Sequence, residues 1–212
     1  MDVLDEHRRN VSAMAYIAKE LNNVVHSAVP SAGLAPVVPR DPGPVSIGPP
    51  LSTATRYLLA GIRLALGWIF LWAFLDKLFG LGHSTVAAKS WINGGSPTQG
   101  FLGGAATGPF TGFYHSIAGA ALTDVLFMAA LLAIGVALLL GVAMRLAAGA
   151  GAVLMVMMWT AVLPPASNPF MDDHLIYAAV LIVLALLGAG GTLGLGAAWA
   201  RVPIVRRFAW LR

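Results

Sequence analysis

The sequence contains no cysteine among its 212 residues. Disulfide bonds, thiolate zinc or iron–sulfur sites and covalent attachment of c-type haem are therefore excluded for this chain. Charged residues are also scarce, because Asp, Glu, Lys and Arg make up 10% of the chain, against about 25% in soluble domains. Together with a hydrophobic content of 58%, this shortage indicates a membrane protein.

Histidine is missing from the apolar runs of the chain, so axial ligands for a b-type haem within a membrane are lacking. No glycine-rich nucleotide-binding motif follows a predicted strand. The net charge of +4 is small, and the positions of the basic residues explain it better than nucleic-acid binding does. We therefore expect no metal site, no covalently bound cofactor and no nucleic-acid partner.

Long apolar segments are what the sequence has in excess. Four of them follow residue 55, and each comes close to the roughly 20 residues that a helix needs to cross a bilayer. The sequence predicts an all-α membrane protein, with a bundle of four transmembrane helices at about residues 56–79, 123–144, 146–163 and 174–190. The segment between the first two helices is expected to form a long outer loop.

The N-terminal segment has the opposite character. Seven prolines fall within residues 30–50, and such a composition neither continues a helix nor buries a core. We expect residues 1–55 to form a disordered, proline-rich cytoplasmic tail. Residues 56–212 are then the membrane domain.

Lysine and arginine are distributed unevenly over this predicted topology. Ten of the 13 lie in the N-terminal flank up to Arg56, in the turn between the second and third helices or in the C-terminal segment. Lys77 and Lys89 lie on the other side, and Arg63 lies within the first helix. Because cytoplasmic loops carry the excess of basic residues, we expect both termini in the cytoplasm. The loops at 78–122 and 164–174 then face outwards.

Polar residues that are able to bind or react with a ligand gather at this outer boundary. We hypothesise that five of them are catalytic, namely Asp76, Lys77, Asp172, Asp173 and His174. The candidates for substrate binding at the same boundary are Lys89, His115 and Asp124. The alternative is structural, since carboxylates at helix N-termini cap free N–H groups and meet the positive end of the helix dipole. On that interpretation, Asp76 and Lys77 only mark the end of the first helix.

Arg63 is a further candidate for substrate binding. It lies about 10 Å beyond Arg56 along the first predicted helix, at a depth where a charge is costly. It either faces the bundle interior and binds an anion or a quinone carbonyl, or extends toward the headgroups. Large polarisable side chains in the third helix either form a slot for a quinone ring or fill gaps in the core, and these are Met155, Met157, Met158 and Trp159.

Several motifs carry a family resemblance. They are RLALGWIFLWAFLDKLFGLG at 63–82, SWINGGSPTQGFL at 90–102, GPF at 108–110 and WTAVLPPASNPFMDDHLIYA at 159–178. Together they resemble the DoxX/DoxD family of small bacterial membrane proteins with four helices, over residues 55–212. The resemblance implies a multi-pass protein of the bacterial cell membrane.

The branch of the family that these motifs resemble is labelled thiosulfate dehydrogenase (quinone), large subunit. The resemblance implies oxidation of thiosulfate to tetrathionate with quinone as the electron acceptor, by two different subunits acting together. No catalytic residue is carried over from the family, so the candidate residues rest on their placement alone. Carboxylates at the outer boundary would repel a thiosulfate dianion, whereas they and His174 suit proton exchange with a quinol.

The sequence therefore predicts a membrane subunit of a quinone-linked oxidoreductase, with thiosulfate as the candidate substrate and quinone as the candidate cofactor. The expected partners are the lipid bilayer and a second oxidoreductase subunit, and a homo-oligomer is left open. Two alternatives also stay open. One is a noncatalytic membrane scaffold for redox or stress-response partners, and the other is a small-solute transporter, for which Arg63 is the hint.

Overall fold

A computed structural model describes residues 14, 16–21, 51–166 and 168–211. The chain divides into two compact units, Met1–Pro49 and Pro50–Arg212. In the first unit the described residues are helical and exposed. The predicted disordered, proline-rich tail falls mostly on residues outside those described. Every long helix of the described chain belongs to the second unit.

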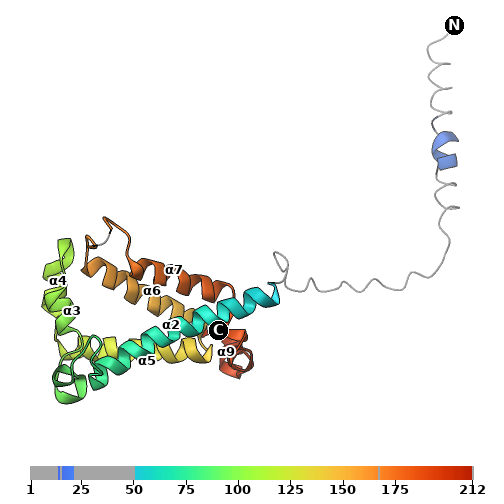
Figure 1. Ribbon diagram of the computed structural model, residues 1–212. Helices are drawn as coiled ribbons and strands as arrows, with labels where there is room; N and C mark the ends of the chain where they lie inside the picture. Colours follow the sequence, from blue (N-terminus) through green and yellow to red (C-terminus); the bar gives the residue numbers. More distant parts are fainter. Residues whose placement is uncertain (1–13, 15, 22–50, 167, 212) are drawn as a thin grey trace, which may run out of the picture. The chain divides into compact units, whose positions relative to one another are not determined.

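The first long helix, α2, spans Thr53–Phe79 (Figure 1). It starts before the predicted residue 56 because the Ser52 hydroxyl accepts a hydrogen bond from the Thr55 N–H group and caps the helix. It ends at Gly80, whose φ of 69° lies in the left-handed region that terminates helices. Its 27 residues give a length of about 40 Å, which exceeds the ~30 Å of a hydrocarbon core.

α5 and α6 form a tight helical hairpin. α5 spans Ala121–Leu140 and α6 spans Met144–Ala161, so the predicted turn at Arg145 is wrong, and Arg145 lies in the first turn of α6. The turn is made instead by residues 141–143, with φ values of 71° at Gly141 and 48° at Ala143. With α2, these helices are the three in the described chain that are long and apolar enough to cross a membrane.

The last apolar helix, α7, is shorter than predicted. It spans Asp173–Leu186, and its 14 residues give about 21 Å, less than the thickness of a hydrocarbon core. Gly188, with φ of 65°, follows the helix and turns the chain away. Short helical elements complete the described chain, namely η4 at Ala189–Gly191, α8 at Gly196–Trp199, α9 at Pro203–Arg207 and η5 at Ala209–Leu211.

The long helices pack as two pairs. α2 packs mainly on α5, α6 packs mainly on α7, and the pairs meet along α5 and α6. Figure 1 shows the pairs close together near the C-terminus and separated at the other end, where α3 and α4 lie across the gap. The shared core buries large apolar side chains of all four helices, among them Leu66, Phe70, Met128, Ile134, Leu138, Met155, Leu181 and Leu184.

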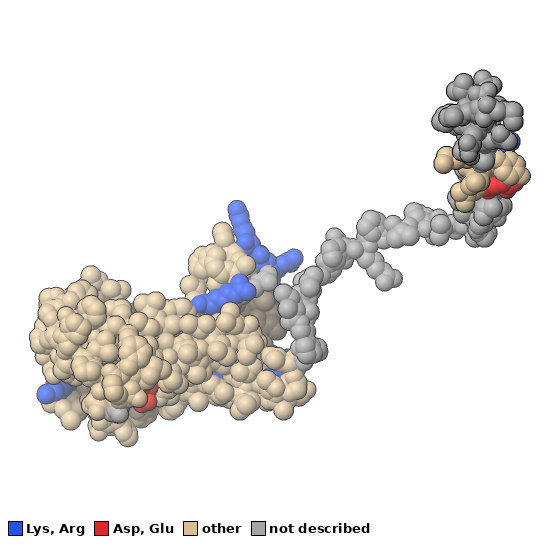
Figure 2. Space-filling model, turned by 90° about the horizontal axis from the view of Figure 1, so that it is seen from above, with Lys and Arg blue, Asp and Glu red and all other residues tan. Residues whose placement is uncertain are grey.

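The outer surface of this unit is largely apolar. Each spanning-length helix exposes large hydrophobic side chains, for example Trp68, Leu126 and Val153. Figure 2 shows few charged side chains over most of the body. In the described part of the chain, helices are joined without any strand, and Leu81 and Val86 form an isolated bridge. The structure thus agrees with an all-α membrane protein, because exposed apolar helices are stable in lipid.

Residues 80–120, between α2 and α5, fold into a small helical layer that we name the cap. It contains η1 at Ala87–Lys89, η2 at Trp91–Asn93, α3 at Gln99–Gly104, η3 at Gly108–Phe110 and α4 at Thr111–Ile117. Its own core joins Ala106 and Tyr114 to Ala161 at the end of α6. The Thr107 N–H group donates to the Ala161 carbonyl at 2.8 Å. The segment predicted as a loop therefore folds over one end of the bundle.

Candidate functional site

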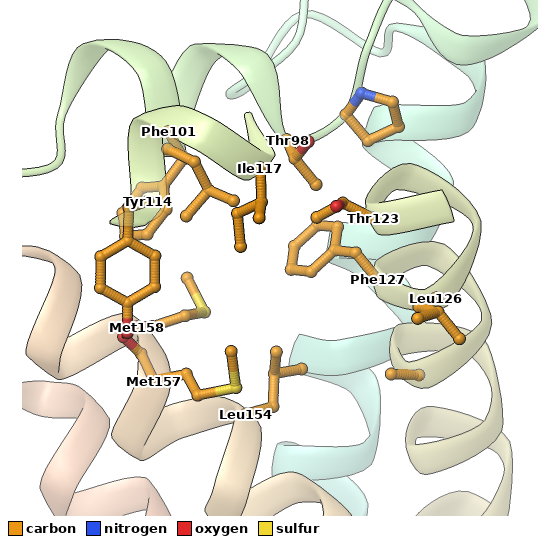
Figure 3. A pocket seen from close by; sticks show the side chains of 13 residues that line it. Thr98, Phe101, Tyr114, Ile117, Thr123, Leu126, Phe127, Leu154, Met157 and Met158 are labelled. Carbon is orange, nitrogen blue, oxygen red and sulfur yellow. The ribbon is translucent and has the colours of Figure 1, made fainter. Parts of the chain in front are cut away.

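A cavity of about 320 Å³ lies between the cap, α5 and α6 (Figure 3). Its size is at the lower end of the roughly 300–1,000 Å³ that is usual for ligand pockets. The wall is almost entirely apolar, and its larger side chains include Phe101, Tyr114, Phe127, Met157 and Met158. Of the four residues of α6 proposed for a quinone slot, two thus line the cavity.

The other two residues proposed for that slot do not line this cavity. Met155 is buried in the main core and lines a smaller groove that is described below. The Trp159 indole N–H donates to the Phe170 carbonyl at 2.7 Å. Tyr114 places its ring in the cavity wall, but its hydroxyl is held by the Met157 carbonyl at 2.9 Å and by Thr160. The cavity is therefore suited to hydrocarbon or an aromatic ring rather than to a polar solute.

Asp124 fastens the cap above this cavity. Its carboxylate is buried and accepts hydrogen bonds from the Ser96 hydroxyl at 2.9 Å, the Thr98 N–H at 3.1 Å and the Thr98 hydroxyl at 2.6 Å. The Thr98 hydroxyl in turn accepts a hydrogen bond from the Gly119 N–H at 3.1 Å. Asp124 therefore holds residues 96 and 98 directly and Gly119 through the Thr98 hydroxyl, and its contact with a substrate stays a prediction.

Asp76 fastens the beginning of the cap in the same way. It is 1% exposed and accepts hydrogen bonds from the N–H groups of His83 and Ser84 at 3.2 and 3.1 Å, and from the Ser84 hydroxyl at 2.7 Å. Among the described residues, His174 and Asp172 make the one acid–base side-chain contact within 4 Å, so Asp76 and Lys77 do not pair with each other. Adjacent residues of a helix point about 100° apart, which separates the two side chains.

A second, smaller groove of about 150 Å³ lies where all four long helices meet. Two of the predicted catalytic residues border it, Lys77 from α2 and His174 from α7. The rest of its wall is apolar or aromatic and includes Phe70, Leu131 and Tyr177. The fold thus brings one cation and one imidazole, which are distant in sequence, to the same apolar groove.

Asp172 holds the imidazole at the edge of this groove. Its Oδ2 lies 2.6 Å from Nδ1 of His174, while its Oδ1 accepts hydrogen bonds from the N–H groups of His174 and Leu175 at 3.1 and 3.4 Å. Asp172 therefore caps the N-terminus of α7 and also orients the ring. A carboxylate that binds one ring nitrogen leaves the other nitrogen, Nε2, for proton exchange with a ligand.

The groove and the cavity under the cap are neighbours. Phe127 of α5 and Met158 of α6 line both of them. Met158 lies between the groove and the cavity, and its side chain can change conformation there, because methionine has three rotatable bonds. The arrangement gives a polar-edged groove beside a wider apolar cavity.

Arg63 lies at the opposite end of the bundle from the groove. Its guanidinium is fully buried and donates to the carbonyls of Leu138 at 2.9 Å, Leu193 at 2.8 Å and Thr192 at 3.2 Å. Its Nε has no partner among the described residues. The guanidinium is therefore enclosed and joins the C-terminus of α5 to residues 192 and 193, and its predicted role in substrate binding stays a prediction.

The remaining predicted residues border neither hollow. Asp173, Lys89 and His115 are exposed at the cap end of the unit, and their roles stay predictions. Sequence reasoning missed Phe127 and Tyr177. Tyr177 follows His174 by three positions, and this spacing places both residues on one helix face, so helical periodicity could have identified it. No group of acidic and histidine residues able to hold a metal is found in the described chain.

Comparison of the chain with protein-family models, curated proteins and solved structures found no match. The resemblance to the DoxX/DoxD family therefore rests on the sequence motifs alone.

Proposed function

We propose that this chain binds a quinone in the membrane and serves as the membrane subunit of a quinone-linked oxidoreductase of the DoxX/DoxD type. The observation that carries the proposal is the groove among the four long helices, where Lys77 and the Asp172–His174 pair border an apolar wall. A quinone combines an apolar ring with two carbonyl oxygens, so it matches a site of this composition. Thiosulfate is the proposed electron donor, on the strength of the motif resemblance.

Lys77 and His174 have complementary tasks in this proposal. The Lys77 ammonium donates a hydrogen bond to a quinone carbonyl, and Nε2 of His174 exchanges a proton with a ring oxygen. Asp172 keeps Nδ1 in place and stabilises the imidazolium. Joining two thiosulfate ions through a sulfur–sulfur bond releases two electrons, and reduction of a quinone to a quinol takes two electrons and two protons. The motif resemblance implies that a second subunit takes part.

The cavity under the cap also has a role in this proposal. It shares Phe127 and Met158 with the groove, and its wall is apolar. A hydrocarbon tail attached to a ring in the groove would be shielded from water there. The groove, at about 150 Å³, has room for a ring only, so the two hollows together suit a quinone with a tail.

The proposed topology has four crossings and both termini in the cytoplasm. α7 begins at the cap end with Asp172 and Asp173, and the chain continues through η4 toward the arginine-rich C-terminal segment. The shorter α7 and the residues that follow it would cross together. The positive-inside rule supports this orientation, because the end of the unit at which the chain terminates carries Arg56, Arg145, Arg201, Arg206 and Arg207.

Binding of a short-chain quinone analogue to the purified protein in detergent tests the site. We expect His174→Gln and Lys77→Gln each to weaken binding roughly tenfold, because a hydrogen bond that involves a charged group contributes about 1.5–3 kcal/mol. His83→Gln is the matched control, since the His83 side chain borders neither hollow. Equal affinity in all four proteins would contradict the proposed site.

Turnover tests the reaction separately. The protein reconstituted in liposomes, with and without partners that copurify with it, is supplied with thiosulfate and the quinone analogue, and quinol is measured. We expect quinol formation that His174→Gln strongly reduces. If the quinone analogue binds but no quinol forms, with or without the partners, thiosulfate is not the electron donor and the quinone site still stands. Partners that copurify in the absence of both binding and turnover would favour the scaffold function.

A further inference from the structure

The end of the bundle opposite the cap carries arginines and no described acidic residue. Arg56 lies in the first turn of α2, Arg145 lies in the first turn of α6, and three more arginines lie in or before α9 at 201, 206 and 207. The four acidic residues of the described second unit lie at the cap end and are Asp76, Asp124, Asp172 and Asp173. Figure 2 shows several lysine or arginine side chains projecting near one end of the body, and blue atoms also at the opposite end. This end therefore attracts anions.

The C-terminal residues 196–211, which we name the platform, are docked on the bundle. Val205 of α9 is fully buried. Arg145 donates through Nη1 to the Ala209 carbonyl at 2.9 Å, and the Trp199 indole N–H donates to the Leu211 carbonyl at 2.6 Å. These contacts fix the position of the arginines relative to the spanning helices, so the charge is part of a built surface.

The platform also exposes large apolar side chains beside its arginines. Ile204 and Trp210 are each 57% exposed, and Phe208 is 41% exposed. The guanidinium carbon of Arg207 lies 5.6 Å from the centre of the Phe208 ring. Exposed apolar side chains and arginines in one short segment are typical of structures that lie in the interfacial region of a membrane. Water alone would leave the apolar half of this surface unfavourably solvated.

A hollow of about 260 Å³ adjoins the platform. Arg145 and Trp199 border it, and glycines form much of the remaining wall, so backbone groups are accessible there. A neighbouring arginine, Arg56, lies 3.3 Å through Nε from the Thr192 hydroxyl at the same end. The hollow is large enough for a headgroup and is bordered by cationic and aromatic side chains.

We infer that this end of the protein binds anionic phospholipids, with the phosphodiester headgroup held by Arg145, Arg201, Arg206 and Arg207 and the acyl chains beside the exposed Ile204, Phe208 and Trp210. A bilayer leaflet supplies the negative charge and the hydrocarbon together, which a free phosphate does not. The inference requires membrane insertion and is independent of the quinone proposal.

Lipid enrichment tests this inference. The full chain is reconstituted in mixed phosphatidylcholine and phosphatidylglycerol vesicles, extracted, and analysed for retained lipid by native mass spectrometry. We expect phosphatidylglycerol to be enriched in the lipid retained by the wild type. In each of the single variants Arg201→Gln, Arg206→Gln and Arg207→Gln the enrichment should fall roughly fivefold, because one arginine contributes about 1 kcal/mol near an anionic surface. Lys89→Gln, at the cap end, is the control and retains the enrichment.

Thermal unfolding provides a second measurement that does not depend on extraction. Phosphatidylglycerol should raise the Tm of the wild type, and this increase should be smaller at high salt. Inorganic phosphate should leave the Tm unchanged. Equal enrichment and equal stabilisation in the wild type and the three single variants would overturn the inference. Stabilisation by soluble polyglutamate that matches the effect of the lipid would identify a protein-binding surface instead and would also overturn it.

Discussion

At the scale of single residues, Arg63 shows how one buried cation joins separate segments. The Arg63 guanidinium donates to the Leu138 carbonyl at the C-terminus of α5, which also accepts from the Gly141 N–H, and to the Thr192 and Leu193 carbonyls. A guanidinium has five N–H donors in a planar fork and can serve several carbonyls at once. Gly141 permits the close approach, because a Cβ at this position would collide with the guanidinium.

We expect Arg63→Met to lower the free energy of unfolding by about 3 kcal/mol, since the Thr192 and Leu193 carbonyls would lose the donor that Arg63 supplies. Arg63→Lys should recover part of the loss, because an ammonium lacks the planar fork. Thermal unfolding in detergent, followed by circular dichroism, measures both changes. An Arg63→Met protein as stable as the wild type would show that the guanidinium does not join these segments.

At the scale of elements, two aspartates at the ends of spanning helices fix the cap. Asp76 near the end of α2 holds residues 83 and 84, and Asp124 in α5 holds residues 96 and 98. Both carboxylates are buried, and each accepts three hydrogen bonds from the cap. Of the two sequence neighbours Asp76 and Lys77, the aspartate therefore holds the cap in place, whereas the lysine borders the groove.

Replacing Asp124 should loosen the cap without unfolding the bundle. We expect amide hydrogen exchange in residues 96–119 of Asp124→Ala to accelerate by roughly tenfold or more, because hydrogen bonds to a charged group contribute about 1.5–3 kcal/mol each. Exchange in α6 and α7 should stay slow. Asp173→Ala is the control, since Asp173 is exposed. Unchanged exchange across the cap in Asp124→Ala would show that other contacts hold it.

At the scale of the whole molecule, the second unit has two chemically different ends. The cap end carries the described acidic residues and the groove, and the platform end carries five arginines. The three helices of spanning length connect these ends. In the proposed topology each end lies on one side of the membrane, and the arginine-rich platform lies on the cytoplasmic side.

The absence of cysteine makes the topology measurable with single introduced thiols. We expect Lys89→Cys, in the exposed part of the cap, to react with a membrane-impermeant maleimide added to intact cells. Arg201→Cys, in the exposed part of the platform, should react only after the cells are permeabilised. The cysteine-free wild type is the blank. Labelling of both thiols in intact cells would contradict the proposed orientation.

The sequence by itself determined the membrane character and the approximate position of the three helices of spanning length. Hydrophobic length is a local property, so it can be read along the chain without knowledge of contacts. The ends of helices were less predictable. The turn at 141–143 depends on backbone conformations of Gly141 and Ala143, and the early end of α7 is followed by the turn at Gly188.

Only the tertiary structure decided which polar residues meet. Asp76 and Lys77 are neighbours in sequence, yet one is enclosed by the cap and the other borders a groove with His174. The packing of two helix pairs, and the cap across their gap, also creates the apolar cavity. Such groupings depend on helix rotation and on contacts between distant segments, and a sequence pattern that is read along one helix contains neither.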